Sequence, residues 1–120
     1  MMTALFIATI VSIGANAFIA LADYVEAELV LKNSAEVRVP VNVLPCLASL
    51  KLAGAVGLVI GVAAVPWFGV AAGVGLVLFF IGAVAAHVRA RVFYNIAFPG
   101  LYLLLAVAST AYMVQKAVGA

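Results

Sequence analysis

Five side chains have chemical groups that could bind or react in a sequence that is otherwise almost entirely apolar. An amide, a carboxylate, an ammonium, an imidazole and a guanidinium can hold protons, ions or polar headgroups. Each lies inside or at the end of a long apolar run, where ionisable groups are expensive and typically mark a functional site. The candidate ligand-binding or partner-binding residues are therefore Asn16, Asp23, Lys51, His87 and Arg89.

Lys51 is the most informative of these residues because of its depth. If its helix begins near residue 43, Lys51 lies about 12 Å inside it, where a lysine costs roughly 2.5–3.5 kcal/mol of insertion free energy. The ammonium could return along its stem to the membrane surface, or it could face the bundle and need an acceptor. Asn16 alone would be an interhelical hydrogen-bonding residue and Asp23 alone a solvated charge. Because Asn16 matches Lys51 in depth and Asp23 lies on the same stripe, we predict that Lys51 faces inward and pairs with this polar end of the first helix.

His87 and Arg89 close the third apolar run. A lone histidine at a helix C-terminus typically complements the helix dipole, and a proton-transferring or quinone-contacting histidine is the alternative. Cys46 is the only cysteine, so no internal disulfide can form. The sequence has no ligand spacing typical of a metal site, no nucleophile paired with a base and no phosphate loop. We expect no metal, no cofactor and no catalytic residues in this chain, which argues against an enzyme that works by itself.

The composition excludes a water-soluble globule. Of the 120 residues, 69% are hydrophobic and 8% are charged, against about 25% charged in typical soluble domains. A formal net charge of +2 without a basic cluster excludes nucleic acid as a partner. Residues 1–22, 52–88 and 92–115 contain no Asp, Glu, Lys or Arg, and about 20 apolar residues suffice to span the hydrocarbon core. The sequence therefore predicts an integral membrane protein.

The apolar runs divide into four helices. We place them at about residues 2–22, 43–65, 68–89 and 98–116. Pro66-Trp67 must interrupt the long middle run because that run is too long to cross a bilayer once. The predicted fold is all-α, a four-transmembrane-helix bundle that forms one domain over residues 1–120.

Small residues predict how the helices pack. In lipid, glycines that allow close backbone contact bring helices together. With only a Pro-Trp turn between them, helices two and three should form a tight antiparallel hairpin, and dimerisation through the same glycines is the alternative. The expected packing residues are Gly54, Gly57, Gly61, Gly75 and Gly82.

The basic residues predict the orientation. Loops one and three share one side of the membrane and carry Lys32, Arg38, Arg89 and Arg91, whereas the other side carries Lys116. Lys and Arg are enriched in cytoplasmic loops. We therefore expect loops one and three to be cytoplasmic.

Several strings resemble a known family of membrane proteins, and together they cover nearly the whole chain. They are Val39-Pro40, Pro45, Lys51-Leu-Ala-Gly54-Ala-Val-Gly57-Leu, Gly75-Leu, Phe79-Phe80-Ile-Gly82, Ala86-His87-Val-Arg89 and Phe98-Pro99. The sequence resembles the DoxX-like family, whose members are small, mostly bacterial four-helix membrane proteins. The family is named after a subunit of a thiosulfate:quinone oxidoreductase, and a related animal branch acts as a chaperone for ligand-gated receptors.

The resemblance implies a multi-pass protein of the bacterial plasma membrane, which is the inner membrane where there are two. Lys51, His87 and Arg89 match recurring polar positions of the family, and Asn16 and Asp23 match the polar end of helix one. The resemblance supplies no catalytic role for any of them.

Three functions remain open at this point. The first is a non-catalytic accessory, assembly or lipid-binding subunit, whose partners would be membrane lipid, another membrane protein or a second copy of the chain. The second is the membrane subunit of a quinone-linked oxidoreductase, in which Lys51 and His87 would contact the quinone headgroup while another chain holds the redox centre. The third is a small-solute transporter, which the sequence supports least because it shows no pair of interrupted helices.

Overall fold

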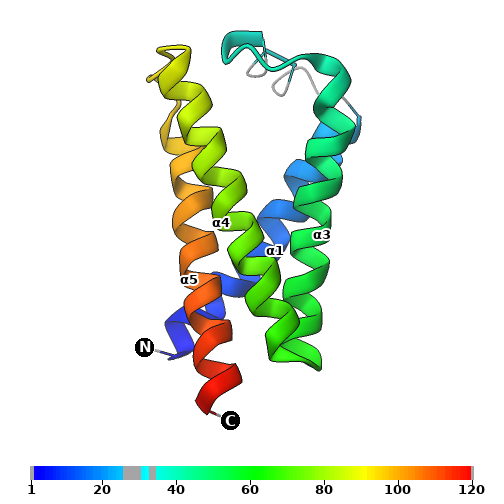
Figure 1. The fold of residues 1–120 in the computed structure, drawn as a ribbon, viewed down its shortest axis with the longest axis vertical. Coiled ribbons are helices and arrows are strands. Elements are labelled where there is room, and N and C mark those ends of the chain that lie inside the picture. Colours follow the sequence, from blue (N-terminus) through cyan, green and yellow to red (C-terminus); the bar gives the residue numbers. More distant parts are fainter. Residues whose placement is uncertain (1, 26–30, 33–34, 120) are drawn as a thin grey trace.

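Four long helices make up the bundle (Figure 1). The computed structural model describes residues 2–25, 31–32 and 35–119. Within these residues the long helices are α1 (Met2–Tyr24), α3 (Leu44–Ala63), α4 (Pro66–Arg89) and α5 (Ala97–Gly119), and a 3-10 turn, η1 (Val41–Val43), precedes α3. All four are long and apolar enough to cross a membrane. The all-α, four-transmembrane-helix prediction is confirmed.

The turn between α3 and α4 lies slightly earlier than predicted. The break falls at Ala64 and Val65, whose N–H groups both donate to the carbonyl of Ile60, and Pro66 is already the first residue of α4. Proline fits there because the first N–H groups of a helix have no intrahelical acceptor. Trp67 follows at this end of the bundle and is 58% exposed, a position typical of an interfacial anchor.

Each helix packs against two neighbours. α1 and α4 both contact α3 and α5. Figure 1 shows both chain ends at one end of the bundle, and the α1–α3 and α4–α5 connections at the other. α3 and α4 are close at their shared turn and diverge towards the two connections (Figure 1).

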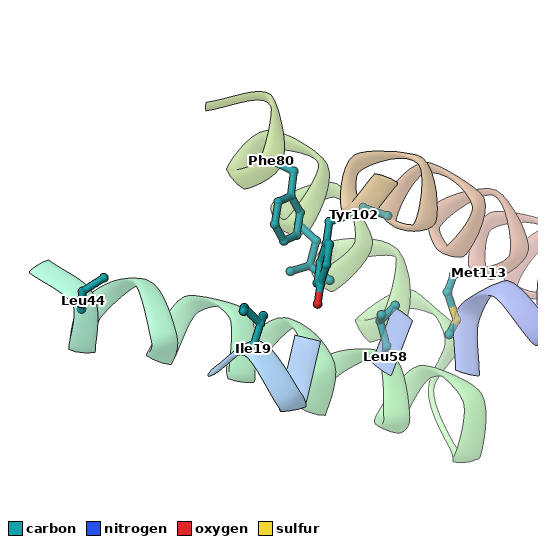
Figure 2. Close-up of a cluster of buried hydrophobic side chains, with 8 residues drawn as sticks. Ile19, Leu44, Leu58, Phe80, Tyr102 and Met113 are labelled. Atoms are coloured by element: carbon teal, nitrogen blue, oxygen red, sulfur yellow. The ribbon is translucent and has the colours of Figure 1, made fainter. Parts of the chain in front are cut away.

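The interior of the bundle is more polar than its outer surface. The outer surface carries large apolar side chains such as Phe18, Leu78 and Leu104, each about two-thirds exposed. Such a surface is unfavourable in water and favourable in lipid. The buried apolar cluster includes Ile19, Leu44, Leu58, Phe80, Tyr102 and Met113 (Figure 2), and the buried polar residues are Thr9, Ser12, Asn16, Asp23, Lys51, His87 and Ser109.

Glycines bring α3 and α4 into close contact near their turn. A Cβ atom added at Gly57 would lie 2.5 Å from the Cβ of Ala72, and one added at Gly61 would lie 2.5 Å from the Cα of Gly69. One added at Gly54 would lie 2.5 Å from the Leu76 side chain. Real Cβ atoms do not approach other atoms so closely. At Gly57 and Gly61 the neighbouring atoms are the Ala72 Cβ and the Gly69 backbone, so these two positions require glycine, whereas at Gly54 the Leu76 side chain would have to shift.

Two of the glycines expected to pack do not do so. A Cβ atom added at Gly75 or Gly82 would meet no described atom within 4 Å, and the prediction that these residues hold the hairpin together is wrong. The face of α4 that contacts its neighbours carries Gly69 and Gly73 instead, and added Cβ atoms there would collide with Met113 and Thr110 of α5. The glycines of α4 therefore lie on two faces of the helix: Gly69 and Gly73 face its neighbours, and Gly75 and Gly82 do not.

These contacts predict that Gly57→Leu lowers stability and that Gly75→Leu does not. Leucine at position 57 would push α3 away from Ala72, and we expect a loss of about 2 kcal/mol or more. Leucine at position 75 enters open space, and we expect a change within about 0.5 kcal/mol. Thermal unfolding of the purified variants in mild detergent measures both, and equal losses would contradict the packing described here.

Candidate functional site

A cavity of about 450 Å³ lies between the diverging parts of α3 and α4. This volume falls within the range of roughly 300–1,000 Å³ typical of small-molecule pockets. Most of its wall is apolar, with side chains such as Leu44, Leu47 and Ala83. Its polar lining residues are Asp23, Lys51, His87, Asn95 and Tyr102.

Lys51 and Asp23 form a buried ion pair at this cavity. Lys51 is 8% exposed and Asp23 is 2% exposed, and the Lys51 Nζ atom contacts Asp23 Oδ2. The ammonium also lies 5.5 Å from the centre of the Phe79 ring, a distance at which a cation is attracted to an aromatic face. The inward-facing arrangement predicted for Lys51 is therefore confirmed.

A hydrogen bond one residue away along α1 supports this pair. The hydroxyls of Tyr24 and Ser49 lie 2.7 Å apart, and Ser49 also donates to the carbonyl of Pro45 at 2.8 Å. Tyr24 follows Asp23, and Ser49 lies two residues before Lys51. The end of α1 is thus joined to the first turns of α3 by two neighbouring polar contacts, and these fix the position of the carboxylate.

His87 contributes a buried ring from α4. It is 4% exposed, and its Nδ1 atom lies 2.9 Å from the carbonyl of Ala83. A carbonyl can only accept, so Nδ1 carries a proton, and in the neutral ring Nε2 is then a hydrogen-bond acceptor. Nε2 is buried and has no hydrogen-bond partner among the described residues. The neutral ring therefore adds an unused acceptor to the cavity lining.

An unusual helix end fixes the position of His87. The N–H of Val92 donates to the carbonyl of His87 at 2.9 Å, and the N–H of Arg91 donates to the carbonyl of Val88 at 3.1 Å. This is the Schellman pattern, in which the residue after the cap adopts a left-handed conformation that is usually supplied by glycine. Here Arg91 adopts it, with φ 58°, at a cost of roughly 1–2 kcal/mol.

Aromatic rings from α4 and α5 form one wall. The Tyr102 ring lies 5.2 Å from Phe80 and is stacked on Phe98 at 5.3 Å. The Tyr102 hydroxyl donates to the carbonyl of Ala15 at 3.1 Å. This bond connects α5 to α1 and satisfies the only polar atom of the Tyr102 side chain.

Residues 35–43, which we call the roof segment, lie at the end of the bundle where α3 begins and α4 ends (Figure 1). Val37, Val39 and Val43 of this segment line the cavity. Two hydrogen bonds hold the segment to the end of α4 and the connection that follows it. Arg89 Nη2 donates to the carbonyl of Val37 at 3.3 Å, and the Tyr94 hydroxyl donates to Glu36 Oε1 at 2.5 Å.

The bond from Tyr94 to Glu36 is stable at neutral pH. Because only the protonated phenol can donate, the bond to the Glu36 carboxylate raises the pKa of Tyr94, with smaller contributions from desolvation and the Glu36 charge. The stability that the raised Tyr94 pKa contributes is present below the ordinary pKa of tyrosine and is lost as pH rises through the still higher folded value.

Comparison with known protein families places this chain. The DoxX-like family model matches residues 7–109. The chain belongs to the DoxX-like family. No curated protein and no solved structure matches it. The matched range includes every residue that lines the cavity of this DoxX-like protein.

The structure brings together three of the five candidate residues. Asp23, Lys51 and His87 line the same cavity. Asn16 is fully buried but lies outside it, and its Nδ2 donates to the carbonyl and hydroxyl oxygens of Ser12. Arg89 also lies outside the lining and holds the roof segment. Within the described residues, no three His, Cys, Asp or Glu side chains come close enough to share a metal ion.

Sequence reasoning missed the aromatic part of this DoxX-like site. Phe79, Phe80 and Phe98 were assigned no role at the site. Their spacing is that of ordinary apolar helix residues. The one available signal was the adjacent pair Phe79-Phe80, which places large rings on two faces of the helix.

The ion pair predicts strong coupling between Asp23 and Lys51. Asp23→Asn should leave a buried ammonium without its counter-charge and lower the free energy of unfolding by about 3 kcal/mol. The double variant Asp23→Asn/Lys51→Met removes both charges and should recover most of that loss. Lys32→Met, which changes an exposed lysine, is the matched control and should be neutral.

A double-mutant cycle on unfolding in bicelles measures this coupling. We expect a large interaction energy between the two positions. Additive losses for the two single variants would contradict a direct pair.

Proposed function

We propose that this DoxX-like protein is a non-catalytic, lipid-binding membrane subunit that holds the polar end of an amphiphile in its cavity. One observation carries the proposal: an apolar cavity of about 450 Å³ contains a buried ion pair and a buried histidine acceptor. Ligand sites typically combine apolar walls with a few convergent polar groups. An amphiphile matches both parts of this lining.

The energetics of the polar groups support a binding role. Burying charges in a membrane protein is costly, and a paired charge rarely adds net stability compared with apolar residues of similar size. A structural core of this size could be built from leucine and alanine alone. The retention of Asp23, Lys51 and His87 around a cavity is therefore explained by a ligand that contacts them.

The aromatic wall favours a quinone as a second candidate ligand. Phe79, Phe80, Phe98 and Tyr102 line the cavity, and flat rings stack favourably on aromatic faces. In this version the headgroup would lie between Lys51 and His87, and electrons would come from a redox centre on another chain. The ligand that copurifies with the protein distinguishes the two candidates.

Native mass spectrometry of protein extracted in polymer-bounded nanodiscs tests the proposal. We expect a copurifying small amphiphile on the wild-type chain. Ala83→Phe should displace it, because Ala83 lines the cavity and the larger ring would fill that space. Ala85→Phe is the matched control, since it makes the same change two residues away on an exposed position. A wild-type chain without a bound molecule, or equal occupancy in both variants, would contradict the proposal.

We also propose that the end of the bundle with the roof segment faces the cytoplasm. Lys32, Arg38, Arg89 and Arg91 gather at this end and Lys116 lies near the other, where it donates to the carbonyl of Val62. Basic residues are favoured on the cytoplasmic side.

Cysteine labelling in intact cells checks this orientation. In a Cys46→Ala background, an impermeant maleimide should label Ala64→Cys directly and Asn42→Cys only after permeabilisation, since both positions are exposed. Labelling of Asn42→Cys from outside would reverse the orientation.

A further inference from the structure

The cavity has an opening at the level of the hydrocarbon core. Three exposed lining residues, Leu50, Leu78 and Gly82, flank the space between α3 and α4. At 1.5 Å per residue, Leu50 lies about 9 Å from the start of α3, and Gly82 and Leu78 lie about 10 and 16 Å from the end of α4. The opening therefore faces lipid tails, well below the level of the connecting segments.

The roof segment covers the cavity on the side that faces water. The roof segment places Val37, Val39 and Val43 against the cavity, and Arg89 and Tyr94 hold it in place. Val37 is only 4% exposed. A ligand dissolved in the bilayer thus has an open path between α3 and α4, whereas one coming from water would have to break these contacts.

The charges in the cavity favour an uncharged ligand. Among the described residues that line it, Asp23 and Lys51 are the only side chains with a full charge, and they compensate each other. An anionic or cationic headgroup would find no free counter-charge. It would also have to pass an opening flanked by leucines in the hydrocarbon core, where a charge is costly.

The histidine determines what polar group the ligand should carry. The Nδ1 proton of His87 is used by the Ala83 carbonyl, so Nε2 offers an acceptor and lacks a partner within residues 2–25, 31–32 and 35–119. An unpaired buried acceptor is costly. A hydroxyl is the simplest uncharged group that donates to it.

We infer that the cavity takes up an uncharged, hydroxyl-bearing amphiphile directly from the bilayer, through the opening between α3 and α4, and that its hydroxyl donates to His87 Nε2. This inference rests on the proposed amphiphile-binding function and specifies its ligand class and route of entry. The ligand's chain lies among the apolar and aromatic walls, and its hydroxyl lies near the ion pair and His87.

Three probes with the same chain test the ligand class. Oleyl alcohol has a hydroxyl donor, methyl oleate has none, and oleyl phosphate is charged. Each is added to the protein in phosphatidylcholine nanodiscs, and occupancy is measured by native mass spectrometry. We expect the alcohol to bind about tenfold more tightly than the ester, since the ester leaves the buried acceptor unpaired, and the phosphate to bind most weakly.

Variants of His87 test the contact. His87→Leu should remove the preference for alcohol over ester, and His87→Gln, which keeps an acceptor oxygen, should retain part of it.

Variants of α4 test the route. Gly82→Leu should slow uptake of the alcohol at least about tenfold by filling the opening, measured as the rate at which occupancy rises after the probe is added. Gly75→Leu is the matched control, because it lies on the same face of α4 but outside the cavity lining.

The possible failures can be told apart. Equal binding of alcohol and ester by the wild-type chain, or tighter binding of the phosphate, would overturn the ligand class while leaving the copurifying amphiphile intact. An unchanged uptake rate in Gly82→Leu would overturn the route. If no probe binds and no molecule copurifies, the proposed function fails as well.

Discussion

The buried ion pair between Lys51 of α3 and Asp23 of α1 is the interaction on which the site depends. Neither charge could remain in an apolar bundle without the other, since an isolated buried ion costs several kcal/mol. The pair therefore fixes the end of α1 against α3, with the bond between Tyr24 and Ser49 beside it. Because the two charges cancel, the polar end of the cavity is strongly dipolar and carries no net charge.

The cavity itself results from unequal packing along α3 and α4. Near their turn, Gly57 and Gly61 allow the two backbones to approach closely. Towards the other end, larger side chains such as Leu47 and Phe79 line the space between the helices, and the helices diverge (Figure 1). The glycines thus determine where α3 and α4 are in close contact. The cavity lies farther from the turn, where this contact is absent. The roof segment then separates the open part from the aqueous side.

Much of the fold and part of the site could be predicted from the sequence, and each predicted feature has its own physical reason. Apolar run length determines the number of helices. Regular helical rise converts sequence position into depth, which is why Lys51 could be paired with the polar end of α1. The long lysine stem explains why the partner is Asp23 at the helix end and not Asn16 at equal depth.

Spacing alone could not determine which way a helix face points. Gly75 shares the small-residue pattern of α4 but meets no described neighbour, because the axial rotation of α4 depends on its contacts with α3 and α5 together. The place of His87 in the cavity lining depends on how α4 is arranged against the other helices, a tertiary feature that one helix cannot reveal. The same holds for Phe98 and Tyr102, which reach the cavity from α5.

The most direct test of this account is the distance between the Asp23 carboxylate and the Lys51 ammonium in a lipid bilayer. Asp23 is the only aspartate in the sequence, so labelling aspartate with ¹³C and lysine with ¹⁵N gives one unambiguous carboxyl signal for solid-state NMR dipolar recoupling. The account predicts strong dephasing, as for an ion pair with N and O within about 4 Å, and its loss in Lys51→Met. Absence of dephasing in the wild-type chain, with the lysine in contact with lipid headgroups, would contradict it.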